Sequence, residues 1–198
     1  MAVLAIALQT TKAQSTSQWY YYAEEFYFVK EVPVKDLRGK NFRYEIAVKS
    51  NPSDTLSKVR IHGINVGKGR EDFLHTDFDM ETRTEQEWTI YTLVGTIDPA
   101  AFKLWFYTAV NGNGNFYFDD ISFYVEMAPG QWKQLELPNT SFESKSGNIF
   151  DGYYVSTRGS KNLQISLTDQ TVKSGRKALY VSTRKQQPAA LLTSNKNY

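Results

Sequence analysis

The stretch that decides the fold is NFRYEIAVK, residues 41–49. Its apolar and polar side chains alternate along the chain. The alternation separates Phe42, Tyr44, Ile46 and Val48 on one face from Arg43, Glu45 and Lys49 on the other. Such a period of two is typical of an antiparallel strand with one buried and one solvated face. The sequence therefore predicts a sheet that covers a hydrophobic core.

Other runs rich in aromatic and β-branched residues also predict strands. These are Lys58–His62, Trp88–Val94, Leu104–Val110 and Phe116–Val125. Turn-forming residues separate them, and the segment Asn111–Asn115 (NGNGN) indicates a tight hairpin. The acidic segment Thr76–Glu87 is expected to be a loop. Many short strands between regular turn signals predict an all-β fold, an antiparallel β-sandwich of the jelly-roll kind.

The composition excludes several classes of protein. The 198 residues include no Cys, which excludes a disulfide scaffold, a thiol nucleophile and a zinc site built on Cys. Two His are too few for a His-rich metal site. With 23 Lys and Arg against 21 Asp and Glu, the charge is nearly balanced, which argues against a nucleic-acid partner. Aromatic residues make up 15% of the chain, enough to fill a core and leave rings for a ligand.

Charge is distributed unevenly along the chain. Residues 14–130 hold 12 basic and 17 acidic residues, a net of −5, whereas residues 131–198 hold 10 basic and 4 acidic residues, a net of +6. Residues 14–130 are predicted to form a β-sandwich module. Residues 131–198 either complete the same sandwich or begin a second one. Opposite net charges would attract the two parts to each other.

The first residues have the pattern of an export signal. Ala2–Leu8 is continuously apolar, and small residues, Thr11 and Ala13, stand at the minus-three and minus-one positions of the expected cleavage site. Residues 1–13 are therefore predicted to be a signal peptide cut after Ala13, which implies an exported protein, periplasmic, cell-surface or extracellular. The alternative is a buried N-terminal strand or helix. The apolar run is too short to cross a bilayer, and no membrane span is expected elsewhere.

Three segments resemble galactose-binding-like jelly rolls, a fold found in many carbohydrate-binding modules. Gly114–Phe123 (GNFYFDDISF) is similar to the final strand of that family, in which a turn and an aromatic residue precede paired Asp residues. Gly39–Tyr44 resembles the strand after a Gly-Lys turn, and Glu87–Tyr91 resembles the W-x-x-Y strand. The resemblance covers roughly residues 20 to 127 and implies a carbohydrate-binding module.

Two later segments resemble the opening of the same fold. Leu137–Glu143 (LPNTSFE) is similar to the opening strand, and Thr171–Val181 is similar to the Ser-Gly turn and strand that follow it. The opening elements would thus come after the closing ones. Either the opening strands complete one sandwich in permuted order, or they begin a truncated second sandwich.

This order of motifs also resembles the noncatalytic region that precedes the peptidase domain of exported bacterial tail-specific serine peptidases. The resemblance implies an accessory domain beside a catalytic domain or partner protein. It carries no activity over to this chain, because none of the motifs belongs to a peptidase domain.

The candidate ligand-binding residues are aromatic, because sugar rings stack on flat apolar faces. They are Trp19, Tyr20, Tyr22, Trp105, Tyr107 and Tyr117, with Trp132 as a further platform. In Leu104–Val110, Trp105 and Tyr107 must face away from Leu104 and Phe106, so one of the two pairs should lie in the core. The alternative is that both pairs are packed inside the sandwich.

The candidate metal ligands are Asp119, Asp120 and Glu143. The family resemblance implies that an acidic residue of the last strand and the Glu of the opening strand hold a structural calcium ion, which prefers oxygen ligands. The alternative is that the Asp residues cap the backbone beside a turn. Adjacent Asp side chains point to opposite faces unless a bulge intervenes. No other cofactor is expected.

The residues predict no catalytic site. His62 and His75 are expected to be surface or structural residues, and no nucleophile elbow is present. The first hypothesis is therefore an exported noncatalytic module that binds carbohydrate or assists an exported hydrolase. The second is a structural or protein-interaction module that packs on a catalytic domain and binds no sugar. An exposed aromatic pair beside polar side chains would favour the first.

Overall fold

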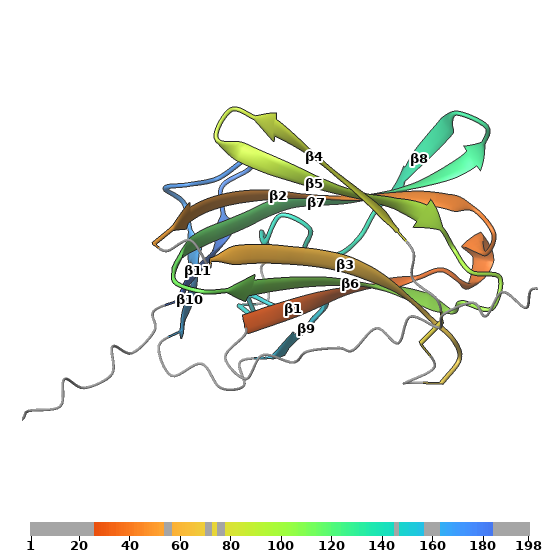
Figure 1. Cartoon of the computed structure of the whole chain (residues 1–198), viewed down its shortest axis with the longest axis horizontal. Coiled ribbons are helices and arrows are strands. Elements are labelled where there is room, and N and C mark those ends of the chain that lie inside the picture. The colour runs from red at the N-terminus through yellow and green to blue at the C-terminus, as the bar shows by residue number, and fades with distance from the viewer. Residues whose placement is uncertain are drawn as a thin grey trace, which may run out of the picture.

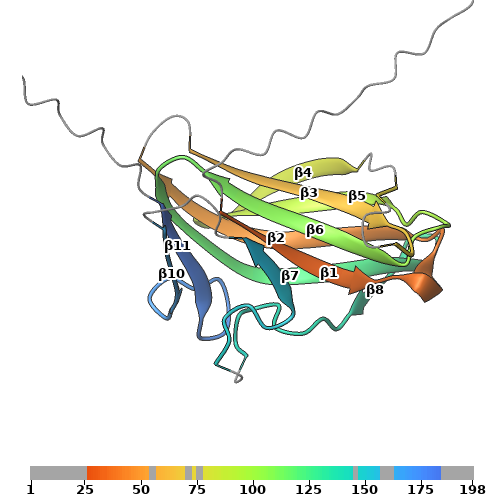
Figure 2. The same cartoon turned by 90° about the horizontal axis from the view of Figure 1, so that it is seen from below.

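The computed structural model of the chain is all-β, as predicted, and describes residues 26–53, 57–69, 73–74, 78–144, 147–156 and 163–183. Two antiparallel sheets of four and seven strands face each other as a β-sandwich (Figure 1 and Figure 2). The described residues contain no helix that is long and apolar enough to cross a membrane. A one-turn 3-10 helix, Lys35–Leu37, follows the first strand.

The four-stranded sheet has the order β3-β6-β1-β9. Its strands are β1 (Phe26–Pro33), β3 (Lys58–Val66), β6 (Lys103–Asn111) and β9 (Tyr153–Ser156). The central pair is β1 with β6, in which Phe26 lies opposite Val110 and Pro33 opposite Lys103 without interruption.

The seven-stranded sheet has the order β10-β11-β7-β2-β5-β4, and β8 also pairs with β7. Its strands are β2 (Asn41–Pro52), β4 (Asp79–Glu85), β5 (Trp88–Thr96), β7 (Gly114–Ala128), β8 (Gln131–Leu135), β10 (Leu163–Thr168) and β11 (Ala178–Thr183). The hairpin β10-β11 lies at one end of the sandwich and β8 at the other (Figure 1 and Figure 2). Strands that follow Gly130 thus join both sheets, since β9 pairs with β1 while β8 and β11 pair with β7.

The alternation in residues 41–49 is confirmed. Phe42, Tyr44 and Ile46 are fully buried and Val48 is 2% exposed, whereas Arg43, Glu45 and Lys49 face outward. The Tyr44 ring stacks on Phe106 of the opposite sheet, with ring centroids 4.0 Å apart and ring planes 4° apart. This stack between the two sheets belongs to one hydrophobic core that extends through the sandwich.

The segment Asn111–Asn115 does not form the predicted hairpin. It joins β6 of one sheet to β7 of the other, and these two strands do not pair. Gly112 has φ 84°, and a side chain there would lie 2.6 Å from the backbone of Ser57. The Asn and Gly residues therefore provide a tight turn, as expected, but the turn crosses between layers because β6 already pairs with β1 and β3 on its two edges.

The prediction of a loop for Thr76–Glu87 is wrong. Asp79–Glu85 is strand β4, which pairs with β5 through a two-residue turn at Gln86 and Glu87. Its side chains are exposed up to the partly buried Glu85 at its end, so no hydrophobic alternation marks it. A charged edge strand of this kind protects a sheet from pairing with another chain.

The segment Leu137–Glu143, expected to be an opening strand, forms turns instead. Asn139 and Phe142 have φ values of 52° and 56°, which interrupt an extended strand. The Phe142 side chain is nevertheless 1% exposed and packs on Tyr153, with ring centroids 5.5 Å apart. The Phe of this motif is therefore a core residue carried by a loop.

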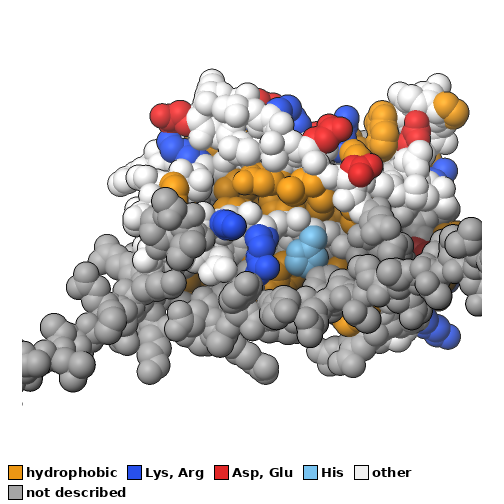
Figure 3. Space-filling model, in the orientation of Figure 1, with side chains coloured by type: hydrophobic (Ala, Val, Ile, Leu, Met, Phe, Trp, Pro, Cys, Tyr) orange, Lys and Arg blue, Asp and Glu red, His pale blue; other side chains and the backbone are white. Residues whose placement is uncertain are grey.

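Phe78 closes the sandwich on the side where β3 and β5 approach each other. Hydrophobic side chains reach the surface in the band between β3 and the strands β4 and β5 (Figure 3). A Cβ atom at Gly63 of β3 or at Gly95 of β5 would lie 2.4 Å from carbon atoms of the Phe78 ring. The two glycines, one in each sheet, thus leave the space that this ring occupies. Phe78 also packs edge-on against Phe42, with centroids 4.9 Å apart.

We expect Gly63→Ala to destabilise the protein by about 1–3 kcal/mol, because the new methyl group overpacks the Phe78 ring. Gly95→Ala should have a similar effect from the other sheet. Urea unfolding of Gly63→Ala, Phe78→Ala and the double variant measures the coupling. The cost of Gly63→Ala should fall once the ring is removed, and equal costs in both backgrounds would contradict this explanation.

Candidate functional site

The outer face of the four-stranded sheet holds the main cluster of partly exposed aromatic side chains. On β6, Leu104 and Phe106 point inward and are fully buried, whereas Trp105 and Tyr107 point outward and are partly buried. The prediction that one of these pairs lies in the core is confirmed for Leu104 and Phe106. The other pair therefore belongs to the surface layer of the sheet.

A first row of rings crosses this face. Trp105 lies between Phe73, which follows β3, and Tyr154 of β9. The ring centroid of Trp105 is 5.8 Å from that of Phe73 and 6.1 Å from that of Tyr154. Phe73 and Tyr154 are each 54% exposed, which is high for large side chains in a sheet protein. The row thus presents aromatic surface to solvent at both of its ends.

A second row lies beside the first. Tyr107 is flanked by His62 of β3 and Tyr27 of β1. The centroid of Tyr107 is 4.5 Å from that of His62, and 4.6 Å from that of Tyr27 in a stacked arrangement. We call the two rows together the aromatic face, and define it as Tyr27, His62, Phe73, Trp105, Tyr107 and Tyr154.

Two charged side chains lie next to Trp105. Its indole N–H donates a hydrogen bond to Oε2 of Glu31, which lies opposite it on β1, at 2.8 Å. Lys103 forms an ion pair with the same carboxylate oxygen at 2.9 Å and lies 5.0 Å from the centroid of the Trp105 ring. The hydrogen bond fixes the indole in position, and the charged groups can donate or accept hydrogen bonds beside it.

His62 contributes an uncharged aromatic ring to this face. Burial, and then the positive charge of Arg60, lower the pKa of its imidazole to about 4. The ring is therefore neutral at pH 7, which suits its packing against Tyr107. The prediction of a structural role for His62 agrees with this position in β3.

The remaining predicted aromatic residues do not join the aromatic face. Tyr117 lies on β7 of the other sheet, packed at a small second cluster that includes Trp88 and Ile90. Trp132 of β8 is 39% exposed, and the Arg43 guanidinium lies 5.4 Å from its ring centroid. The predictions for Trp19, Tyr20, Tyr22 and His75, and the predicted signal peptide 1–13, lie outside the described residues.

The three predicted metal ligands converge on one segment, Lys173–Lys177, as acceptors of hydrogen bonds. Oδ2 of Asp119 accepts the backbone N–H groups of Lys173 and Ser174 at 2.8 and 3.2 Å. Asp120 accepts the Ser174 hydroxyl, and Glu143 accepts the backbone N–H groups of Arg176 and Lys177. The carboxylates thus tie the turn before β11 to β7 and to the loop that carries Glu143.

All three carboxylates accept hydrogen bonds, as the capping alternative to a calcium ion predicts. Within the described part of the chain, no three His, Asp or Glu side chains are grouped closely enough to hold a metal. The capping role, which the sequence left open as the alternative, explains the hydrogen bonds of Asp119.

Four members of the aromatic face were not predicted to bind a ligand, and one of them, His62, was expected to be a surface or structural residue. Tyr27 and Tyr154 each follow an inward-facing aromatic residue, Phe26 and Tyr153, so the alternation of their strands contains the signal. Phe73 offers none, because a single bridge to Val66 places it beside the sheet.

Comparisons of the chain with protein-family models, with curated proteins and with solved structures find no match.

Asp119 should make stability depend on pH. Its burial raises the pKa of the carboxyl from 3.8 to about 6, against the lowering effect of the N–H groups that it accepts. The folded state then binds a proton more readily than the unfolded state, so stability should fall as the pH rises from 4 to 6. We expect this group to contribute a loss of about 1–2 kcal/mol between pH 4.5 and pH 7.

Urea unfolding at the two pH values measures this contribution. Asp119→Asn should remove most of it, whereas Asp169→Asn, at an exposed turn, should retain the pH dependence of the unchanged chain. An Asp119→Asn variant that keeps the full dependence would show that another group titrates.

Proposed function

We propose that the chain is a noncatalytic β-sandwich module that binds carbohydrate on the aromatic face. The observation that carries the proposal is the row Phe73, Trp105 and Tyr154, whose two end members are 54% exposed. Aromatic rings in this setting offer flat apolar surface to the C–H groups of a sugar. A ligand that spans the row would contact rings carried by β6, by β9 and by the segment after β3.

The polar groups beside the row support a hydroxylated ligand over a purely apolar one. Glu31 and Lys103 lie at the centre of the row, next to the indole of Trp105. Their carboxylate and ammonium groups can exchange part of their mutual ion pair for hydrogen bonds to sugar hydroxyls. Binding sites for small molecules commonly combine aromatic walls with a few such polar groups.

We propose that the module functions outside the cytoplasm, in an exported bacterial protein. This part of the proposal rests on the apolar run Ala2–Leu8 and on the resemblance of the later motifs to the noncatalytic region of tail-specific serine peptidases. In that setting the module would hold a hydrolase, in the same chain or as a partner, near a glycan.

A second candidate function is packing on a protein partner. The observation that favours it is the indole N–H of Trp105, which already has its acceptor in Glu31 and so needs no partner from a ligand. A contiguous apolar face of this kind can also bind a protein surface. This alternative predicts that the same residues matter for partner binding and that no glycan competes.

Glycan-array binding by the full chain tests the proposal. Trp105→Ala should weaken binding by about 10-fold or more, because it removes the central ring of the row. Tyr154→Ala should weaken binding less, since it removes one end. Trp132→Ala serves as the matched control, since it removes a partly exposed Trp from the other sheet.

The outcomes separate the two candidate functions. Loss of binding in Trp132→Ala with no loss in Trp105→Ala would place the ligand on the other sheet and overturn the proposed site. Absence of binding to any glycan by a chain that unfolds cooperatively would favour the protein-interaction module.

A further inference from the structure

On one of the two edges of β7, none of the described strands pairs with a short stretch in the middle of the seven-stranded sheet. One edge of β7 pairs with β2 along most of its length. The other edge pairs with β11 from Gly114 to Phe118 and with β8 from Phe123 to Ala128. Residues 119–122 lie between these two stretches and pair with neither β11 nor β8. The backbone N–H of Ile121 is instead satisfied by the carbonyl of Thr140, at 2.9 Å.

A β-bulge marks the same stretch. The pairing of β7 with β2 shifts between Glu45 and Ala47, which lie opposite Ser122 and Asp119. Asp120 has φ 48°, a conformation that L-residues with a side chain adopt rarely. Bulges redirect side chains and often adjoin functional sites. Here the bulge turns Ser122 and Tyr124 to the outer face of the sheet while Ile121 and Phe123 enter the core.

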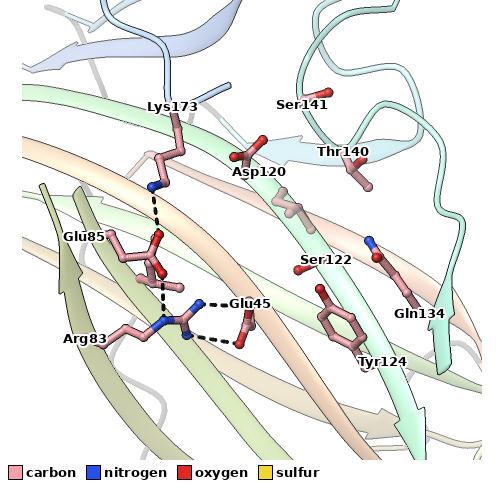
Figure 4. A pocket seen from close by; sticks show the side chains of 12 residues that line it. Glu45, Arg83, Glu85, Asp120, Ser122, Tyr124, Gln134, Thr140, Ser141 and Lys173 are labelled. Atoms are coloured by element: carbon pink, nitrogen blue, oxygen red, sulfur yellow. Dashed lines mark hydrogen bonds and ion pairs between the residues drawn. The ribbon is translucent and has the colours of Figure 1, made fainter. Parts of the chain in front are cut away.

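A cavity of about 330 Å³ lies over this gap, on the sheet opposite to the aromatic face. Its walls come from β2, β4, β5, β7, β8, the loop at Thr140 and the turn at Lys173 (Figure 4). The volume is at the lower end of the range for small-molecule sites. Segments distant in the sequence therefore meet around one concave polar space.

One wall of the cavity is charged. Ion pairs join four of its charged groups, and the fifth, the Asp120 carboxylate, accepts the Ser174 hydroxyl. Arg83 donates hydrogen bonds to both carboxylate oxygens of Glu45, at 3.1 and 3.3 Å, and to Glu85 at 2.9 Å. Lys173 binds Glu85 at 2.7 Å, which completes a chain of ion pairs (Figure 4). The hydrogen bonds from Lys173 and Arg83 lower the pKa of Glu85, so the pairs persist at neutral pH.

The opposite wall is neutral and rich in hydrogen-bonding groups. It consists of Ser122, Tyr124, Gln134, Thr140 and Ser141. Figure 4 shows that the Tyr124 hydroxyl and the Gln134 amide lie on the same side of the cavity, facing the ion pairs. The face of the Tyr124 ring is covered by the Arg43 guanidinium, 4.4 Å from the ring centroid, so the ring offers its hydroxyl rather than a stacking surface.

We propose that this cavity is a second binding site, for a small neutral polyhydroxylated compound such as a monosaccharide. An anionic ligand would meet the Asp120 carboxylate and would have to break an ion pair of the first wall, whereas a neutral one need not. The five neutral side chains of the second wall can donate and accept hydrogen bonds from several directions, which matches the hydroxyl groups of a sugar. The site is independent of the aromatic face, because it lies on the other sheet and works without stacking.

Backbone-amide NMR titration of the full chain tests the proposal with D-galactose, D-glucose and D-glucuronate. Saturable shifts with a neutral sugar are expected at the amides of Ser122, Gln134, Thr140 and Ser141. Tyr124→Phe, which removes one hydroxyl, should weaken this binding by about 2- to 10-fold. Gln134→Leu should weaken it similarly. D-glucuronate, which carries a carboxylate, should bind more weakly than D-glucose.

Trp105→Ala is the matched control, because it alters the aromatic face and leaves the cavity unchanged. Its cavity shifts should equal those of the unchanged chain, so failure at one site is visible separately from failure at the other. The proposal is overturned if no neutral sugar shifts these amides saturably. It is also overturned if D-glucuronate binds more tightly than D-glucose, or if neither Tyr124→Phe nor Gln134→Leu weakens binding.

Discussion

The register of β1 against β6 is the constraint on which both the core and the aromatic face depend. It sets Glu31 opposite Trp105 and places the hydrogen bond between them on the outer face. Because side chains alternate with a period of two, a slip by one residue would move Trp105 and Tyr107 into the core and expose Leu104 and Phe106. The cost of exposing two fully buried side chains, about 1.5–3 kcal/mol each, opposes such a slip. The same alternation that packs the sandwich therefore presents the rings to a ligand.

Much of the fold could be predicted because alternation and turn residues are local signals. The strands around Phe42–Val48 and Leu104–Val110 follow their patterns, and the sandwich class follows from the number of such strands. Pairing partners are not local. The NGNGN segment could be recognised as a tight turn, but nothing within it decides whether the two strands it joins share a sheet. For the same reason, the sequence indicated Trp105 and Tyr107, whereas the rings from other strands that complete the aromatic face depend on pairing.

Strand β1 shows a second limit of sequence patterns. Its inward positions are Phe26, Phe28, Lys30 and Val32, so a charged residue interrupts the buried face. Lys30 is fully buried and donates hydrogen bonds to the carbonyl groups of Pro138 and Gly152, while its ammonium lies 4.0 Å from the centroid of Tyr153. Burial lowers the pKa of this amine to about 8. The ammonium group is tolerated in the core because carbonyl groups of a later segment accept its hydrogen bonds. No sequence pattern within β1 contains this information.

The polar cavity depends on the same kind of distant contact. The Asp119 carboxylate accepts a hydrogen bond from the backbone N–H of Lys173. The side-chain ammonium of Lys173 forms an ion pair with Glu85 on β4. This ion pair joins the net basic part after Gly130 to the net acidic part before it, the attraction that the charge distribution suggested. Lys173 is thus held at its backbone by the buried carboxylate of Asp119 and at its ammonium by the partly buried carboxylate of Glu85. Since the ammonium of Lys173 forms part of the cavity wall, the shape of that wall depends on the docking of the later segment against β7.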